Sequence, residues 1–471
     1  MKTRARTTAW LLTLLIWIPE AFAMEFSPCA DAGASPVLDG SWCTHVAVPA
    51  DHAGRDAGQL SLFIRKFPAT GASKGSVWAI AGGPGESGAS LYPFVAVLRR
   101  SFPGFDLFIP DHRGTGRSSR LCPEEESEAS PGGTALAGAE WGSCFGRLQA
   151  HPQPAGQFTI TNAAHDLRQL VRQLQPANGK PVYLYGVSYG TQLILRALQP
   201  GPLPVSGLVL DSLVPVDTDA RWDLSRRSQV VDEVGRQVLA QCDADASCAA
   251  AMGEPLERIY RRVLANLAAK PALLARVPGK DLRQFLGTLL DMPPLRARIP
   301  FLIRDLDRGQ ARELDAVRAG LSALQATLGD AASMPPSIPL VGIISKSEND
   351  LRPGREMTAL RQEEAPLLFT SPLPALLADS TLPAYARDAY FGKHPVQLPP
   401  TLVLQGRLDP KTPFQGARKH ADTLREHGPL GLVAVGGAPH FILWTAPGCF
   451  QRHVAAFVAG DKPIDAECMM F

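Results

Sequence analysis

Short apolar runs alternate with segments of helical periodicity in the first half of the chain. The runs predict strands at residues 61–66, 77–81, 106–110, 182–186 and 207–211. Between them, Ala163, Leu167 and Leu170 recur at helical spacing, and Asn162 is the expected N-cap of that helix. Strands that alternate with helices indicate βαβ units and a mostly parallel central sheet flanked by helices.

The pattern changes after residue 217, where the chain becomes rich in Leu, Ala and Arg at helical spacing with Pro-rich breaks. Strand and helix return at 401–404 and at 453–458. We therefore predict an α/β core that is interrupted by a large helical insertion. The expected parts are a first core segment, a helical cap and a second core segment: 24–217, 218–395 and 396–471.

The first 23 residues have the pattern of a cleaved signal peptide. Lys2, Arg4 and Arg6 precede a ten-residue apolar run, and Ala-Phe-Ala at 21–23 is a small-x-small cleavage pattern. The alternative, a membrane anchor, needs about 20 apolar helical residues. We predict export to the periplasm or the medium, with no stable membrane insertion after cleavage. No oligomeric state is predicted.

The net charge is +2, with 47 basic and 45 acidic residues, and the excess belongs to the leader. A balanced charge argues against nucleic acid as a partner, because binding phosphates requires an excess of Lys and Arg. All eight cysteines follow the predicted cut, and an even number in an oxidising compartment favours disulfides. The simplest pairing joins neighbours: Cys29–Cys43, Cys122–Cys144, Cys242–Cys248 and Cys449–Cys468.

The strongest chemical signal is Gly-Val-Ser-Tyr-Gly at 186–190, which follows an apolar strand and opens a helix. This is the strand–turn–helix context of a nucleophilic serine, here Ser188. The serine must adopt a strained backbone, and glycines two positions before and after it relieve the crowding. A chance Gly/Ser turn is the alternative, and it explains neither the strand nor the helix.

A nucleophilic hydroxyl needs a base, and the base needs an orienting acid. His440 is the predicted base, because it lies on a Gly-rich loop after the apolar run 433–435. Asp409 is the preferred acid, since it follows the strand at 401–404 and gives the chain order Ser, Asp, His. Asp211, at the end of another strand, is its rival. We expect His112 to make a structural hydrogen bond. Three further histidines are predicted to be solvated: His165, His420 and His427.

The loop Ala-Gly-Gly-Pro-Gly at 81–85 has glycines without side chains, so its backbone N–H groups can approach a substrate closely. The N–H groups of Gly82 or Gly83, together with that of Tyr189, are the predicted oxyanion hole. The same loop also fits a dinucleotide fingerprint, but its proline removes one phosphate-binding N–H and the chain is predicted to be exported. No Cys-x-x-Cys or His-Glu-x-x-His spacing occurs. We therefore predict neither a metal nor an organic cofactor.

Together the motifs at 82–85, 111–118 and 186–191 resemble those of α/β-hydrolases of the prolyl and tripeptidyl aminopeptidase group. The likeness is greatest to the secreted tripeptidyl aminopeptidase-like members, whose C-terminal region is similar to 401–413 and the late cysteine pair. The helical insertion is matched only in position and size. The resemblance implies an α/β-hydrolase fold with a helical cap over the serine.

The resemblance also implies a Ser-His-Asp serine peptidase that cleaves short peptides from a free N-terminus. Such a cap must hold the substrate's α-ammonium with carboxylates. The candidates are Glu233, Glu348, Asp350, Glu363 and Glu364, of which Glu348 and Asp350 are favoured because the short apolar run 341–345 leads into them. Two departures from the family pattern, Ala81 and the Pro-His-Phe sequence at 439–441, leave the acyl and leaving-group preferences open. A carboxylesterase with the same triad and a catalytically silent binding protein are the alternatives.

Overall fold

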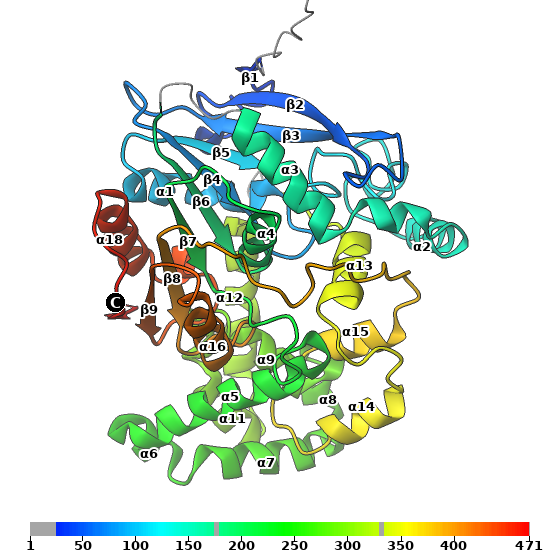
Figure 1. Ribbon diagram of the computed structural model, residues 1–471. Coiled ribbons are helices and arrows are strands. Elements are labelled where there is room, and N and C mark those ends of the chain that lie inside the picture. The colour runs from blue at the N-terminus through cyan, green and yellow to red at the C-terminus, as the bar shows by residue number, and fades with distance from the viewer. Residues whose placement is uncertain (1–24, 174–178, 329–333, 471) are drawn as a thin grey trace, which may run out of the picture.

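A central sheet organises the part of the chain that the computed structural model describes, residues 25–173, 179–328 and 334–470 (Figure 1). The predicted signal peptide lies outside these ranges. The strand order is β1-β2-β3-β5-β4-β6-β7-β8-β9-β10, antiparallel from β1 to β5 and parallel from β5 to β10. The strands are β1 Ser27–Pro28, β2 Trp42–Pro49, β3 Gln59–Phe67, β4 Ser76–Ile80, β5 Asp106–Pro110, β6 Val182–Val187, β7 Gly207–Asp211, β8 Thr401–Gly406, β9 Leu430–Gly436 and β10 Ala466–Met469.

Helices cover both faces of this sheet. The helices α3 (Ile160–Gln173), α4 (Tyr189–Leu198) and α16 (Phe414–Leu424) lie on the face toward the viewer in Figure 1. They share one apolar cluster that includes Leu167, Leu193 and Leu424. A second cluster joins the other face to α1 (Val95–Ser101) and α18 (Pro447–Val458), through Leu98, Phe450 and Phe457. The predicted mostly parallel α/β core is confirmed.

The insertion forms a helical layer beside the sheet, drawn green to yellow in Figure 1. It has its own apolar cluster, in which Tyr260, Leu286, Ile303 and Phe369 are buried. Its helices are α5 Arg227–Ala244, α6 Ala246–Met252, α7 Leu256–Asn266, α8 Pro271–Leu274, α9 Leu282–Leu289, α10 Pro293–Arg296, α11 Ile299–Asp307, α12 Arg312–Leu328, α13 Ile338–Glu348, α14 Met357–Glu364 and α15 Leu373–Asp379. The remaining α-helices are α2 Glu140–Ala150 and α17 Ile442–Thr445.

The predicted cap of α3 is wrong. Asn162 lies inside the helix, and its backbone N–H donates to Oγ1 of Thr159 at 3.0 Å. The Asn162 side chain instead accepts a hydrogen bond from the backbone N–H of His52, 110 residues away in the chain. Thr159 therefore supplies the capping oxygen, one turn earlier than predicted.

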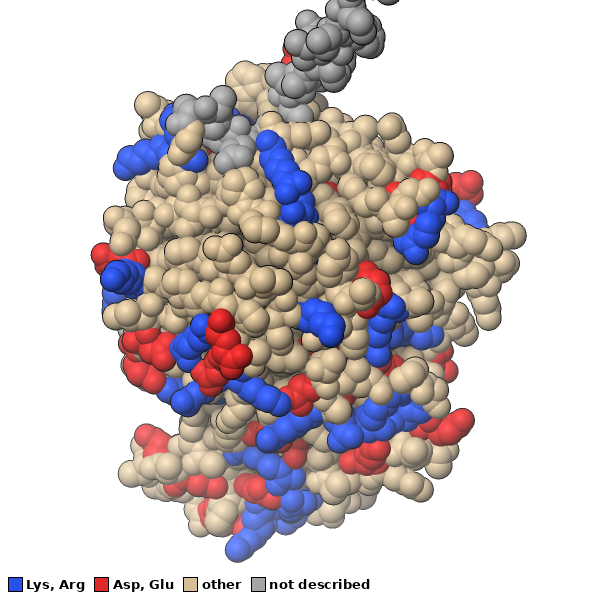
Figure 2. Space-filling view, in the orientation of Figure 1, with Lys and Arg blue, Asp and Glu red and all other residues tan. Residues whose placement is uncertain are grey.

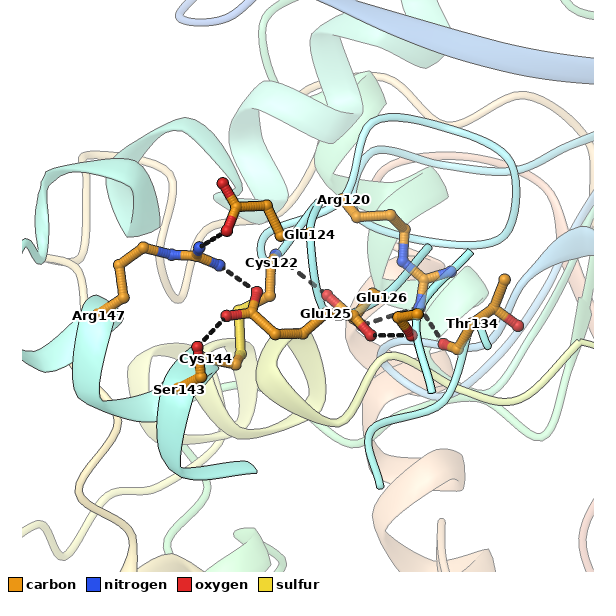
Figure 3. Close-up of a disulfide and its surroundings, with 10 residues drawn as sticks. Arg120, Cys122, Glu124, Glu125, Glu126, Thr134, Ser143, Cys144 and Arg147 are labelled. Carbon is orange, nitrogen blue, oxygen red and sulfur yellow. Dashed lines mark hydrogen bonds and ion pairs between the residues drawn. A yellow bond between two sulfur atoms is a disulfide. The ribbon is translucent and has the colours of Figure 1, made fainter. Parts of the chain in front are cut away.

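The four disulfides pair as predicted, and the described residues contain no free cysteine. Figure 3 shows the Cys122–Cys144 bond, which ties the acidic segment after β5 to α2. Beside it, Glu125 forms an ion pair with Arg147, and Glu126 forms one with Arg120. The segment 124–138, which the sequence suggests is a mobile loop, is thus anchored at its acidic end.

Charged side chains of both signs alternate on the face shown in Figure 2, mostly over the helical insertion. The part of this face that covers the sheet carries few charges. No helix within the described ranges is long and apolar enough to cross a membrane.

Candidate active site

Ser188 stands between β6 and α4 in a backbone conformation that few residues adopt, with φ 53° and ψ −122°. The flanking glycines make this turn possible. A Cβ atom on Gly190 would lie 2.6 Å from the carbonyl oxygen of Ile80, and one on Gly186 would lie 2.7 Å from the backbone of Gly190. The α4 N-terminus directly behind Ser188 adds free N–H groups at the turn.

His440 and Asp409 meet at the carboxyl ends of β8 and β9. Nδ1 of His440 lies 2.8 Å from Oδ2 of Asp409, which is completely buried. Asp409 also accepts hydrogen bonds from the backbone N–H groups of Lys411 and Thr412, from Oγ1 of Thr412 and from Nε2 of Gln405. Ser188 and His440 line the same cavity. The structure therefore brings together the three residues that the sequence singles out.

These contacts decide the charge of Asp409. Burial alone would raise its pKa, but the imidazole of His440 and the hydrogen bonds outweigh burial and hold the pKa below the ordinary value. The carboxylate is ionised at neutral pH, and it can stabilise a protonated imidazole at His440.

Asp211, the rival acid, is used differently. Its oxygens accept hydrogen bonds from the backbone N–H groups of Ile442 and Leu443, at 2.8 and 2.9 Å, and from the hydroxyl of Tyr185. Burial raises the pKa of Asp211 to about 6, although these hydrogen bonds oppose the shift. The contacts hold the segment that follows His440 and do not include the imidazole ring.

The other histidines differ from one another in burial. His112 lies buried against Tyr189, with Nδ1 3.2 Å from the carbonyl oxygen of Arg113, so it makes the expected structural contact. The prediction that His420 is solvated is wrong, because it is buried and donates from Nδ1 to the carbonyl oxygen of Val214. Burial lowers the pKa of both His112 and His420 to about 4. His165 and His427 are partly buried, and His165 stacks on another histidine ring.

The glycine-rich loop after β4 reaches the serine. A Cβ atom on Gly82 would lie 3.3 Å from the Cβ of Ser188, and Gly83 has a φ of 108°, which favours glycine. The loop is held from the insertion side, where the Ser337 N–H donates to the carbonyl oxygen of Gly85 at 2.9 Å. The backbone of Gly82 and Gly83 thus lies beside Ser188. Tyr189, the third predicted oxyanion donor, directly follows Ser188 and is the first residue of α4.

Two cavities meet at Ser188. The larger, of about 250 Å³, is lined by His440, Glu86 and Trp444 from the core and by residues of the insertion. The smaller, of about 60 Å³, is lined by three carboxylates, Asp217, Asp219 and Asp223. Arg227 and Lys411 belong to the wall that the two cavities share.

Neither Glu348 nor Asp350, the predicted ligands of the substrate amine, lines these two cavities. Glu348 is 2% exposed and forms an ion pair with Nη2 of Arg196 at 3.1 Å. Asp350 is buried and accepts a hydrogen bond from the backbone N–H of Arg352. Because Arg196 engages Glu348 and neither carboxylate lines the cavities at Ser188, the geometry does not support this prediction.

The acidic cavity was missed in the sequence, although a signal for it exists. Asp217, Asp219 and Asp223 follow β7 closely, and open α/β sheets bind ligands at the carboxyl ends of their strands. Within the described residues, one group of side chains has a spacing suitable for a metal, Cys29, Asp31 and Cys43, and its two cysteines form a disulfide.

Comparison with known proteins agrees with this geometry. Residues 79–242 match the family model described as alpha/beta hydrolase fold, and residues 378–468 match the model described as TAP-like protein. The chain has the α/β-hydrolase fold. It is 25% identical to the "Serine protease Hip1" of Mycobacterium tuberculosis (strain ATCC 25618 / H37Rv) and of Mycobacterium bovis (strain ATCC BAA-935 / AF2122/97), over 94% of this chain and 91% of each relative.

Solved structures are more distant. The proline iminopeptidase of Mycobacterium smegmatis shares 15% identity and a TM-score of 0.39, over 88% of this chain and 98% of its own. A thermophilic esterase from Thermogutta terrifontis shares 15% identity and a TM-score of 0.36 over the same fractions. Likeness at this level does not inform on the reaction. From the family models and the Hip1 relationship, the predicted enzyme class, a serine peptidase with the α/β-hydrolase fold, is confirmed.

Proposed function

We propose that the protein is an exported aminopeptidase, of prolyl or tripeptidyl type, that cleaves short peptides from a free N-terminus. The observation that carries this proposal is the acidic cavity beside Ser188, lined by Asp217, Asp219 and Asp223. A cationic α-ammonium that leaves water needs nearby carboxylates, and a neutral ester or an N-blocked peptide does not.

In the proposed reaction, Oγ of Ser188 attacks the scissile carbonyl and Nε2 of His440 takes the proton. Asp409 holds the opposite ring nitrogen, at 2.8 Å, and stabilises the imidazolium that forms. Backbone N–H groups of Gly82 or Gly83 and of Tyr189 stabilise the tetrahedral oxyanion, by about 3 kcal/mol for each donor. His440 then protonates the leaving amine, and water hydrolyses the acyl-enzyme by the same route.

Among the three carboxylates of the smaller cavity, Asp223 is the one best suited to receive the amine. Its Oδ2 accepts hydrogen bonds from Ser225 and Leu351, but its Oδ1 has no hydrogen-bond partner among the described residues and forms only a long ion pair, 3.8 Å, with Nε of Arg226. Asp219 is already paired with Lys419, and Asp217 accepts a hydrogen bond from Gln192. A buried carboxylate oxygen without a donor is costly unless a ligand supplies one.

Export is supported by the leader pattern and by the four disulfides, which persist in oxidising compartments. Expression with the leader in a bacterial host is expected to give periplasmic or secreted protein whose N-terminal residue is Met24. A mature protein that keeps residues 1–23, found by mass spectrometry of its N-terminal peptide, contradicts export by this route.

The peptidase proposal is tested with chromogenic di- and tripeptide amides that carry a free amine, their N-acetylated forms and short acyl esters. Wild type is expected to cleave the free-amine peptides, and Ser188→Ala is expected to cleave nothing. Equal cleavage of N-acetylated peptides, or cleavage of esters alone, rejects the aminopeptidase. Absence of any turnover that depends on Ser188 points to the silent binding protein.

A further inference from the structure

Arg227 occupies a central place that the proposed mechanism does not explain. It is the first residue of α5 and lies on the wall that both cavities share, beside Ser188. Its side chain is partly buried, and among the described residues no hydrogen bond or ion pair reaches its guanidinium group. A cation that is removed from water without a partner is unfavourable, so this guanidinium is poised to receive an anion.

Buried arginines elsewhere in the protein have such partners. Four of them form ion pairs: Arg65 with Asp31, Arg113 with Asp166, Arg120 with Glu126 and Arg196 with Glu348. Arg168 and Arg296 donate to backbone carbonyl oxygens instead. Arg227 differs from all six, because its guanidinium lies at a cavity and has no ion-pair or hydrogen-bond partner among the described residues.

The neighbouring charges do not neutralise Arg227. Asp291 forms an ion pair with Lys411 at 3.1 Å, and Asp409 is bonded to His440. Burial lowers the pKa of the Arg227 guanidinium, although Asp409 and Asp291 oppose that shift. A positive charge at the first position of a helix also opposes the helix dipole. The position therefore destabilises the free protein and favours an anionic ligand.

We propose that Arg227 binds a carboxylate of the substrate. A guanidinium binds a carboxylate through two parallel hydrogen bonds, which makes arginine suited to this role. The carboxylate comes either from the C-terminus of a short peptide or from an acidic side chain next to the scissile bond. This inference rests on the proposed aminopeptidase function, and it defines the substrates as short peptides that carry both an amine and a carboxylate.

The arrangement of charge limits the length of a substrate that uses its C-terminus. Arg227 and the three aspartates line the same small cavity of about 60 Å³. In the proposed binding mode the ammonium of a short peptide lies on the aspartates and its carboxylate on Arg227, whereas the C-terminus of a long peptide lies farther from this wall. Lys411, on the same wall, is already paired with Asp291 and is not needed for this contact.

The test compares kcat/KM for three pairs of substrates by quantifying the released products. The first pair is a peptide one residue longer than the fragment that the enzyme releases, with its C-terminus either free or amidated. The second pair is the amidated peptide with Glu or Gln as the residue before the scissile bond, and the third is a free-amine peptide and its N-acetylated form. Arg227→Met and Arg227→Lys are the variants. Arg221→Met is the matched control, because Arg221 is an exposed arginine of the same segment that stacks on Trp222 and lines neither cavity.

Wild type is expected to prefer the carboxylate member of the first or second pair by about 10- to 100-fold, as for one charge-assisted hydrogen-bonded pair. Arg227→Met is expected to bring that ratio close to 1, Arg227→Lys to retain part of it, and Arg221→Met to leave it unchanged. The pair that shows the preference identifies the source of the carboxylate.

Ratios near 1 in wild type for both carboxylate pairs overturn the inference, and this result does not depend on whether any variant folds. An unchanged preference in Arg227→Met overturns it as well. The third pair tests the proposed function separately, because loss of the free-amine requirement rejects the aminopeptidase whatever the carboxylate ratios are.

Discussion

At the scale of single residues, two buried carboxylates beside the His440 loop have opposite surroundings. Asp409 receives an imidazole and four other hydrogen bonds, which keep its pKa low, whereas burial dominates at Asp211 and raises its pKa to about 6. Both follow strands, so strand position alone could not separate them. Chain order favoured Asp409, and the contacts explain why the two groups serve different purposes.

Substitution of each carboxylate by its amide is expected to separate these roles. Asp409→Asn should lower kcat by about 10³- to 10⁴-fold with little change in KM, because the imidazole loses its correct tautomer and its charge partner. Asp211→Asn should mainly lower the melting temperature, since an amide cannot accept both backbone N–H groups as a carboxylate does. Steady-state kinetics and thermal unfolding measure the two effects, and the reverse pattern identifies Asp211 as the catalytic acid.

His112 gives a prediction for the pH dependence of stability. Burial lowers its pKa to about 4 in the folded protein, so between pH 4 and 6.5 the unfolded chain binds a proton that the folded protein does not. The contribution of His112 to the free energy of unfolding is therefore fully present above pH 6.5. It is lost as the pH falls toward 4, by up to about 3 kcal/mol.

The variant His112→Asn isolates this contribution from that of other buried groups, such as Asp211, whose pKa is shifted in the opposite direction. The free energy of unfolding of wild type minus that of the variant should fall as the pH drops from 7 to 4.5 in urea titrations. A difference that stays constant over this range contradicts the prediction.

At the scale of elements, the hydrophobic pattern predicted the inner strands of the sheet but not the strands near its edges. Strands β5 and β7 begin and end at the predicted residues, because they are buried on both faces and read as uninterrupted apolar runs. Strands β1, β2 and β10 lie near the edges and have mixed or exposed residues, so their sequence carries no clear period. The anchoring of segment 124–138 was missed as well, because Arg120 and Arg147 flank it from outside.

The disulfide shown in Figure 3 is expected to stabilise that segment. The double variant Cys122→Ser with Cys144→Ser opens a loop of sequence separation 22 and should lower the free energy of unfolding by about 3 kcal/mol in the chain-entropy model. Cys242→Ser with Cys248→Ser is the matched control, with a separation of 6 and an expected loss of about 2 kcal/mol. Urea titration of both under non-reducing conditions measures the difference, and a smaller loss at 122–144 argues against the anchoring role.

At the scale of the whole molecule, the insertion and the core each contribute residues to the apolar cluster of the other. Leu340, Ile343 and Ile344 of α13 belong to the apolar cluster of the sheet, although the helix lies within the inserted sequence. Leu408, from the second core segment, belongs to the cluster of the insertion. Composition shifts along the chain predict where an insertion begins and ends, but they do not reveal such contacts, since these depend on packing between distant segments.

The ion pair between Arg196 of α4 and Glu348 of α13 is the polar counterpart of this shared packing. Both side chains are 2% exposed, and Arg196 also approaches Asp217, a wall of the smaller cavity, at 3.6 Å. Burial raises the pKa of Glu348, and Arg196 opposes that shift. We expect this pair to hold the insertion against the nucleophile helix and not to bind substrate.

Glu348→Gln therefore discriminates between a structural ion pair and the substrate-amine contact that the sequence suggests. The variant leaves Arg196 without its closest buried counterion and is expected to lose about 3 kcal/mol of stability in urea titrations. Its preference for free-amine over N-acetylated peptides should stay at the wild-type level, whereas Asp223→Asn should reduce that preference about tenfold or more. If Glu348→Gln unfolds like wild type but loses the preference for a free amine, then Glu348 is the amine ligand after all, and the acidic cavity beside Ser188 needs another role.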